Sequence, residues 1–341
     1  MSEGVGEAGT GPRVTVAIVA YQSGDFLQPC VDALAAQSFA DFEAVIVDND
    51  STDGSIEALR LPDARFRVRR MGRNLGFAGG NNVAARESRA PWFATLNPDT
   101  RVDPGWLEAL MAATVRWPQA ASFGSTQVSL DDPDTLDGVG DVWHAAGVAW
   151  RARLGRPVSE TPPESEVFAP CGAAALYRRD LFVDHGGFDE RFFCYCEDLD
   201  LAYRLRLLGW TAVQVADAVV RHAGSGISGR TSEFTLFHGH RNRVWTYLKN
   251  TPGVWVWLLL PYHLAYDLAM TWSSRKVGRL GVVARAHWAA FVGAGPILRS
   301  RREVQRARTA PVKDLFDAMA WSPAAPLKRD VARRLLGERY G

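Results

Sequence analysis

The first 117 residues alternate strand-like and helix-like segments, and this alternation restricts the folds open to the chain. Short runs that read as strands lie at 14–21, 42–50, 66–71 and 91–99. Segments that favour a helix follow them at 25–39, 54–60, 81–89 and 105–117. The first two strand runs are continuous and apolar, as in strands buried on both faces. The order predicts an α/β fold with a mostly parallel central sheet flanked by helices.

Composition narrows the class of protein further. The chain has 341 residues, 47% of them hydrophobic, which is enough for one large domain or two ordinary ones. A formal net charge of +1 gives no reason to expect nucleic acid, and we predict no nucleic-acid partner. The four cysteines are too few and too irregular for a disulfide framework, which fits a reducing, cytoplasmic setting.

Three regions are expected. Residues 1–12 are Gly-rich and predict a disordered lead-in without the features of a signal peptide, and residues 13–250 form the main domain. Residues 251–341 form a helical C-terminal region that is first aromatic and apolar and then strongly basic. This region could lie on an anionic membrane face, or pack on itself or on another copy as a homo-oligomer. Its apolar runs are too short or too interrupted to span a bilayer.

Polar side chains follow the second and fourth predicted strands. The stretch "VDNDSTDGS" contains Asp48, Asp50 and Asp53, which could bind a nucleobase and ribose or form an Asx turn. "LNPDT" places Asn97 and Asp99 two residues apart, where their oxygens could face Mg²⁺ or Mn²⁺ or belong to an Asn-Pro turn. Ligands of parallel sheets bind at the carboxyl ends of strands, so these positions are candidate site residues.

A glycine-rich stretch, "NLGFAGGNN", follows the third predicted strand. It lacks the GK[ST] of a Walker loop and is not a GxGxxG fingerprint. Gly76, Gly79 and Gly80 would let the backbone approach a ligand closely. Alternatively, the stretch is a helix-entry loop in which Asn81 or Asn82 caps the helix.

Two adjacent acids open a helix-like segment in "FFCYCEDLDLAYRLRLLGW". Leu201, Leu205 and Leu208 form one apolar stripe, and Glu197 and Asp198 fall in the first turn. The helix dipole favours a carboxylate there and is expected to keep Asp198 ionised. Taken alone, the segment reads as a capped surface helix.

The order of the motifs is more specific than any one of them. His222, which follows the strand-like run "TAVQVADAVV", would alone be more often structural than a ligand. In the order VDNDSTDGS, NLGFAGGNN, LNPDT, GGFDERFFCYCEDLDLAYRLRLLGW and His222, the chain resembles the inverting, GT-A-fold glycosyltransferases of family 2. The resemblance covers about residues 13–250 and is strongest to the bacterial rhamnosyltransferase-like branch.

The resemblance implies a role for each matching position. The donor-binding residues would be Tyr21, Asp48, Asn49, Asn74, Gly76, Asn97 and Asp99. Asp99 and His222 would hold Mg²⁺ or Mn²⁺, and Asp198 would be the catalytic base. Glu197 and Tyr195 would bind the acceptor, and the aromatic residues before Glu197 would wall its site. Asn97 replaces the first acid of the family's DxD motif, and Asp50, where many relatives have a small or neutral residue, receives no role.

The function implied is metal-dependent transfer of a sugar with inversion, most simply of rhamnose from dTDP-rhamnose. The acceptor would be a hydroxyl of a growing bacterial surface glycan, lipid-linked forms included, at the cytoplasmic face of the plasma membrane. UDP-galactofuranose, UDP-glucose and UDP-GlcNAc are alternative donors. A sugar nucleotidyltransferase would need a GxGTRL-like loop after the first strand, where "VAYQSGDF" stands instead. A non-catalytic scaffold of glycan assembly is the third alternative.

Overall fold

The computed structural model describes residues 11–224, 229 and 232–329, so residues 1–10 of the predicted lead-in lie outside it. A 10-stranded sheet forms the centre, and a separate two-stranded hairpin lies beside it. The sheet contains β1 (Val14–Ala20), β2 (Phe42–Asp48), β3 (Phe66–Arg70), β4 (Trp92–Leu96), β5 (Thr100–Val102), β6 (Ala120–Ser129), β7 (Leu136–Gly138), β10 (Ser165–Val167), β11 (Ala174–Arg178) and β12 (Thr211–His222). The hairpin consists of β8 (Asp141–His144) and β9 (Val148–Arg151).

The strands follow the order β10-β12-β6-β11-β4-β1-β2-β3. The first four predicted strands are β1 to β4, and β1 pairs in parallel with both β2 and β4. Between β4 and β6 lies β11, antiparallel to both, so β6 and its parallel neighbour β12 point the same way as β4. The prediction of an α/β fold with a mostly parallel central sheet is therefore confirmed, with antiparallel strands inserted.

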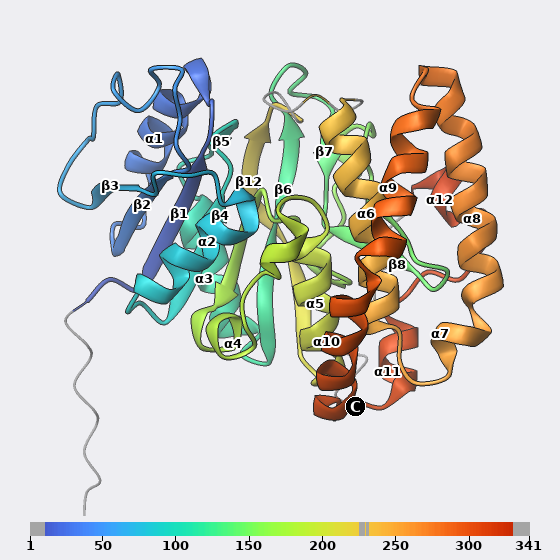
Figure 1. Ribbon diagram of the computed structural model, residues 1–341. Coiled ribbons are helices and arrows are strands. Elements are labelled where there is room, and N and C mark those ends of the chain that lie inside the picture. The colour runs from blue at the N-terminus through green and yellow to red at the C-terminus, as the bar shows by residue number, and fades with distance from the viewer. Residues whose placement is uncertain (1–10, 225–228, 230–231, 330–341) are drawn as a thin grey trace, which may run out of the picture.

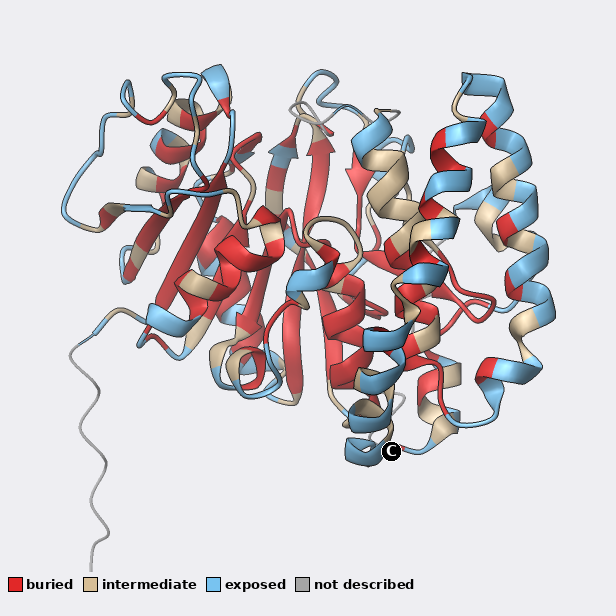
Figure 2. Ribbon diagram, in the orientation of Figure 1, coloured by how far each residue is buried: buried red, intermediate tan, exposed pale blue. Residues whose placement is uncertain are grey.

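Helices cover both faces of this sheet (Figure 1). On one face, α1 (Leu27–Ala35) and α3 (Trp106–Arg116) pack against side chains such as Val16 and Ile18. On the other face, α2 (Gly76–Glu87), α4 (Arg179–Asp184) and α5 (Glu197–Leu207) pack against Ala17 and Val19. Successive residues of β1 therefore pack into two separate cores, which explains why the strand is buried along its whole length (Figure 2).

Two predicted helices differ from the structure. Residues 54–60 form turns, not a helix, because Asp53 accepts hydrogen bonds from the N–H of Gly24 at 2.8 Å and of Ser55 at 3.2 Å. These bonds favour the Asx-turn alternative for this part of the motif. The helix predicted at 81–89 begins earlier, at Gly76, so Asn82 is not its cap. The Nδ2 of Asn82 donates a hydrogen bond to the carbonyl of Phe188 at 2.7 Å instead.

Helix α5 is buried on almost every side and is not the capped surface helix that its sequence suggested. Arg206, off the apolar stripe, donates to Glu166 at 2.8 Å. Asp200 accepts hydrogen bonds from Arg204, Lys249 and Asn250, each at 2.8 Å. Paired charges can be buried because each partner replaces the hydration that the other has lost.

The C-terminal region is helical, as predicted. It contains α7 (Trp255–Leu258), α8 (Leu260–Ser273), α9 (Leu280–Val292), α10 (Ala294–Ala307), α11 (Val312–Asp317) and α12 (Ala325–Lys328), after α6 (Glu233–Asn250). These helices stand at the opposite side of the molecule from β3 (Figure 1). Tyr247 of α6, Val256 and Leu315 join Tyr203 of α5 in one buried cluster. In the described part of the chain, none of the helices combines the length and the apolar character needed to cross a bilayer.

The Asp200 network yields a stability prediction. We expect Asp200→Ala to lower the free energy of unfolding by about 3–5 kcal/mol, since it leaves the buried cations of Arg204 and Lys249 without this partner. Glu87→Ala, which removes a surface pair with Arg69, should cost no more than about 1 kcal/mol. Urea unfolding of both variants measures the difference. Equal losses would contradict the role given to the network.

Candidate active site

The shared direction of the strands brings their polar ends to one edge of the sheet. Tyr21 follows β1, Asp48 ends β2 and Asn49 follows it, Asn97 follows β4, and His222 ends β12. These residues are up to 201 positions apart in the chain. Two adjoining cavities open here, and we call them the strand-end cavity and the hairpin cavity.

The strand-end cavity has a volume of about 490 Å³. Most of the predicted donor and metal residues line it, namely Tyr21, Asn49, Asn74, Gly76, Asn97, Asp99 and His222. Asp48 is buried and does not line it; its Oδ1 accepts a hydrogen bond from the N–H of Ser51 at 2.9 Å. Asp50 is exposed and has a φ of +70°. It lines neither cavity, and the structure assigns it no role.

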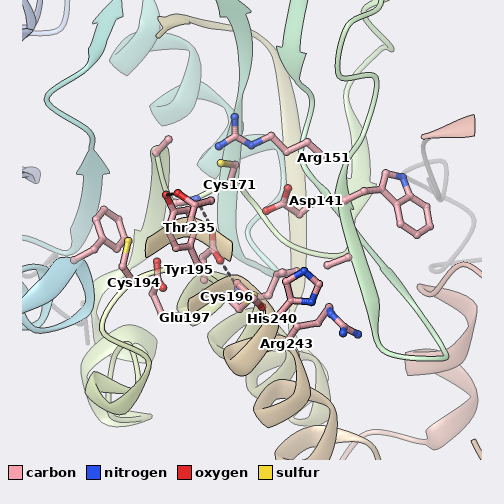
Figure 3. Close-up of a pocket in the computed structure, with 18 of the residues that line it drawn as sticks. Asp141, Arg151, Cys171, Cys194, Tyr195, Cys196, Glu197, Thr235, His240 and Arg243 are labelled. Carbon is pink, nitrogen blue, oxygen red and sulfur yellow. Dashed lines mark hydrogen bonds between the residues drawn. The ribbon is translucent and has the colours of Figure 1, made fainter. Parts of the chain in front are cut away.

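The hairpin cavity has a volume of about 390 Å³ and lies between the β8–β9 hairpin, the start of α5 and α6 (Figure 3). Asp198, Glu197 and Tyr195, predicted as base and acceptor residues, line it. The two cavities share a wall, which consists of Phe77, Asn97, Arg151, Cys194 and Tyr195. The structure thus groups the predicted donor and acceptor residues in adjacent spaces.

A close backbone contact joins the glycine-rich stretch to the loop before α5. Gly76 has a φ of +70°, and a Cβ there would lie 2.4 Å from the carbonyl oxygen of Phe193. Asn74 accepts a hydrogen bond from the Gly76 N–H at 2.8 Å, and Asn49 donates to the Gly76 carbonyl at 2.9 Å. Glycine is therefore required both by conformation and by space. The two asparagines also brace this loop beside the cavity.

The loop at 193–196 is itself held in an uncommon conformation. Phe193, Tyr195 and Cys196 have φ values of +65°, +71° and +64°. Asn242 of α6 stabilises them, because its Nδ2 donates to the carbonyls of Phe192, Cys194 and Tyr195 at 2.7–2.9 Å. Such backbone strain persists where the surroundings enforce it, and it is common at functional sites. The sequence offered no signal for the role of Asn242.

The aromatic wall is smaller than the sequence suggested. Phe192 is fully buried and packs edge-on against Trp245, so it belongs to the core. Phe193 lines the strand-end cavity, and Tyr195 lines both cavities. The hydroxyl of Tyr195 lies 3.0 Å from that of Thr235. Phe192 therefore faces the core, whereas the residues that follow it face the cavities.

Asp99 and His222 face each other as a candidate cation site. His222 Nε2 lies 3.4 Å from Asp99 Oδ1, and His222 Nδ1 lies 2.7 Å from Asp137 Oδ2. Burial lowers the pKa of His222, but hydrogen bonds with Asp137 and Asp99 outweigh it and raise the pKa above its ordinary value. Among the described residues, the buried Asn97 Oδ1 has no hydrogen-bond partner. Oxygen and imidazole donors of this kind fit Mn²⁺ or Mg²⁺.

Asp137, on β7, was not predicted. Its contact with Nδ1 fixes the ring of His222, as carboxylates commonly do for histidines that bind metals. Arg151 also contacts Asp137, and its Nη1 lies 3.4 Å from His222 Nδ1. Asp137 and Arg151 lie in the irregular passage after residue 125, where neither strand nor helix spacing drew attention to them.

Asp198 is fixed at the start of α5 with one hydrogen bond to each carboxylate oxygen. Oδ2 accepts from the N–H of Gly172 at 2.8 Å, and Oδ1 accepts from the N–H of Leu199 at 2.7 Å. Burial raises the pKa of Asp198 above its ordinary value, although these N–H groups and the charge of Arg151 act in the opposite direction. Burial therefore affects this pKa more than the helix start, which alone would favour the ionised form. A raised pKa makes the carboxylate a stronger base.

Further acidic groups surround the base. Carboxylate oxygens of Asp141 and Asp198 and the Sγ of Cys171 lie within 4.8 Å of one another. Burial, and next the charge of Asp198, raises the pKa of Asp141 to about 8. Burial and Asp198 also raise the pKa of Glu197 well above its ordinary value, and Glu197 Oε2 has no hydrogen-bond partner in the described part of the chain. At neutral pH the cluster holds protons that exposed acids would have lost.

Solved structures identify the fold as that of the GT-A glycosyltransferases. A mannosyltransferase, PcManGT from Pyrobaculum calidifontis, solved with GDP-Man and Mn²⁺, matches 90% of this chain and 88% of its own, with a TM-score of 0.52 and 20% identity. GalNAc-T7, solved with UDP, GalNAc and Mn²⁺, matches 70% of this chain with a TM-score of 0.56 and 16% identity. The match spans 48% of the GalNAc-T7 chain.

The sequence identifies the family. The family model described as glycosyl transferase family 2 matches residues 15–186. N-acetylglucosaminyl-diphospho-decaprenol L-rhamnosyltransferase of Mycobacterium tuberculosis is 30% identical over 285 residues, covering 75% of this chain and 90% of its own. The chain belongs to glycosyltransferase family 2, and it is a glycosyltransferase. The predicted family and fold are thus confirmed, while the roles of individual site residues stay predictions.

The raised pKa of Asp141 yields a prediction about pH. Between its ordinary value and about 8, the folded protein keeps a proton that the unfolded chain releases, so stability falls as pH rises through this window. Asp141→Asn mimics the protonated acid and should lose less stability than the wild type between about pH 5 and about pH 8. A single titrating group changes the free energy of unfolding by at most about 1.4 kcal/mol per pH unit. Thermal unfolding at both pH values measures this. Asp131→Asn, in an exposed loop, should follow the wild type.

Proposed function

We propose that the protein transfers rhamnose from dTDP-rhamnose, with inversion, to a hydroxyl of a growing bacterial surface glycan, lipid-linked forms included. The observation that carries the proposal is the adjoining pair of cavities, with predicted donor residues in one and Asp198 in the other. The donor sugar is suggested by the rhamnosyltransferase that is 30% identical, whose name also specifies an acceptor on a diphospho-decaprenol.

In this proposal Asp198 is the general base. The acceptor hydroxyl binds in the hairpin cavity and gives its proton to a carboxylate oxygen of Asp198 as it attacks the anomeric carbon. A new C–O bond forms there, and the bond from that carbon to the diphosphate breaks with its electron pair going to the phosphate oxygen. Attack opposite the leaving group inverts the configuration. A base placed in this way typically contributes about 10²–10⁴-fold to the rate.

Residues around Asp198 prepare it for this step. The N–H groups of Gly172 and Leu199 fix its orientation, and each oxygen keeps acceptor capacity for the substrate. Glu197, whose pKa is raised well above its ordinary value by burial and by Asp198, lines the same cavity and can contact the acceptor sugar. Tyr195, in the shared wall, can contact both substrates.

Asp99 and His222 would hold Mg²⁺ or Mn²⁺, with Asn97 nearby to supply an amide oxygen. When bound, a divalent cation neutralises the negative charge that develops on the departing nucleoside diphosphate. Asp137 keeps His222 turned so that Nε2 faces Asp99. The two structural neighbours were both solved with Mn²⁺.

Other donors give distinct outcomes in one assay. UDP-galactofuranose, UDP-glucose and UDP-GlcNAc would use the same two cavities, whereas membership of the family argues against a nucleotidyltransferase or a non-catalytic scaffold. Nucleotide release can be measured for each sugar nucleotide with and without a lipid-diphosphate-linked GlcNAc acceptor. Release of dTDP that depends on the acceptor supports the proposal. Release only from a uridine donor would change the assigned sugar but not the class of reaction.

Replacing the base tests the mechanism directly. We expect Asp198→Asn to lower turnover by at least ~10²-fold with little change in donor affinity, since the amide keeps the shape but cannot accept the proton. Single-turnover kinetics and donor titration measure the two effects separately. Asp184→Asn, an exposed aspartate at the end of α4, is the matched control. A variant with near-normal turnover would remove Asp198 from this role.

The cation site makes a separate prediction. Asp99→Ala should weaken donor binding in the presence of Mn²⁺ or Mg²⁺ because it removes a charged oxygen ligand. His222→Ala should act in the same direction and more mildly. Donor affinity measured with the cation and with EDTA tests both variants. If wild-type binding and activity survive EDTA unchanged, neither residue is a metal ligand.

We further propose that the catalytic domain is residues 13–250 and that the C-terminal region, 251–341, docks on the anionic inner face of the plasma membrane. Helices α7, α8 and α9 contain many exposed residues (Figure 2). Among them are the large apolar side chains of Trp257, Leu268, Trp272, Trp288 and Phe291. Met270 of α8 lines the hairpin cavity, so these helices border the proposed acceptor site. A lipid-linked acceptor would then reach the site from the membrane. An interface between copies is the alternative.

The basic residues of this region are not equivalent. Arg301 donates to the carbonyls of Leu248, Thr251 and Gly253 and so caps the end of α6. Arg275 stacks on Trp272, with its guanidinium carbon 3.9 Å from the ring centre. Lys276 follows it in the short 3-10 helix after α8 and is exposed. Near an anionic leaflet, each such cation contributes on the order of 1 kcal/mol.

Vesicle sedimentation tests the membrane proposal. We expect binding to anionic vesicles that weakens at high salt without vanishing, and poor binding to neutral vesicles, because salt screens charge but not apolar burial. Arg275→Glu/Lys276→Glu should reduce binding at low salt, whereas Arg60→Glu/Arg89→Glu, exposed elsewhere, should not. If the wild type stays in the supernatant with anionic vesicles at low salt, the surface serves protein contacts instead.

A further inference from the structure

Arg151, the last residue of β9, lies in the wall shared by the two cavities. Of the described residues that line the strand-end cavity, it alone is an arginine or lysine. Figure 3 shows its guanidinium beside Cys171 and Asp141, above the hairpin cavity. A permanent positive charge thus stands at the junction of the proposed donor and acceptor spaces.

The structure holds this side chain at two points. Its Nη1 donates to Asp137, which is itself buried and bound to His222. Its aliphatic stem packs on Gly138, where an added Cβ would lie 3.2 Å from the stem carbons. In the described part of the chain, no hydrogen bond occupies its Nε or Nη2. Those N–H groups are therefore available to a ligand.

The shared wall is also where the chemistry must occur. Under the proposed function, the anomeric carbon lies between Asp198 in the hairpin cavity and the diphosphate in the strand-end cavity. A group at the junction therefore lies next to the bond that breaks. The Asp99–His222 site adjoins the same position, since Arg151 Nη1 is 3.4 Å from His222 Nδ1. Guanidinium groups bind phosphate oxygens through pairs of parallel hydrogen bonds.

We propose that Arg151 is a further catalytic residue that binds the β-phosphate of the sugar nucleotide through its Nε and Nη2. This inference rests on the proposed function. As the bond from the anomeric carbon to the phosphate oxygen breaks, the electron pair stays on that oxygen and its negative charge grows. Arg151 stabilises this charge electrostatically and transfers no proton, because the guanidinium remains protonated throughout.

Nucleotide binding tests the inference without any acceptor. Calorimetric titration would compare dTDP with dTMP, and UDP with UMP, in the presence of Mg²⁺. We expect the wild type to bind the diphosphate more tightly than the monophosphate. Arg151→Gln should lower diphosphate affinity at least about 10-fold, because it removes one charged hydrogen-bonded contact. Its monophosphate affinity should be nearly unchanged. Arg151→Lys should be intermediate, since it keeps the charge but not the fork.

Arg156→Gln, which replaces an exposed arginine in the turn after β9, is the matched control and should behave as the wild type. Thermal unfolding checks the fold of each variant. If Arg151→Gln does not fold, the diphosphate affinity of Arg151→Lys tests the inference instead. An unchanged diphosphate preference, or an equal loss for mono- and diphosphates, would overturn the inference while the proposed function stands. If the wild type binds neither diphosphate, the proposed function itself fails.

Discussion

The common direction of β1, β2, β4 and β12 is the constraint on which the site depends. Parallel strands end at the same edge, so the polar residues that follow them meet there even though the chain separates them widely. Strand β11 lies between β4 and β6 and is antiparallel to both. Because the direction changes from β4 to β11 and again from β11 to β6, β6 runs the same way as β4. Without that strand order, Asp99 and His222 would not face each other.

The buried acids Asp200 and Asp198 have pKa values shifted in opposite directions. Asp200 is surrounded by Arg204, Lys249 and Asn250. The charges of Lys249 and then Arg204 outweigh the effect of burial and hold the pKa of Asp200 below its ordinary value. Around Asp198, burial dominates and the acids outnumber their cationic partners. The first arrangement anchors α5, and the second leaves groups that can take up and release protons. Asp198 and Asp200 lie on the same helix, two residues apart.

The β8–β9 hairpin and the nearby β7 complete the site from outside the regular part of the sheet. They supply Asp137, Asp141 and Arg151, which orient the histidine, surround the base and face both cavities. Helix α6 adds Asn242 and, together with Met270 of α8, closes the hairpin cavity on its other side. Under the proposed function the strand ends would bind the donor, while the hairpin and the helices define the space in which an acceptor would lie.

The sequence by itself determined the α/β alternation, the parallel strands and most residues of the strand-end cavity, because local apolar periodicity and strand-end polarity are written in short stretches. It also placed Glu197 and Asp198 at a helix start. Only the tertiary structure decided that α5 is buried, that Phe192 belongs to the core and that Asp198 has a raised pKa. These depend on neighbours distant in sequence, as does the meeting of Asp137 and Arg151 with His222. Pairing and burial are properties of the assembled chain, and no local pattern encodes them.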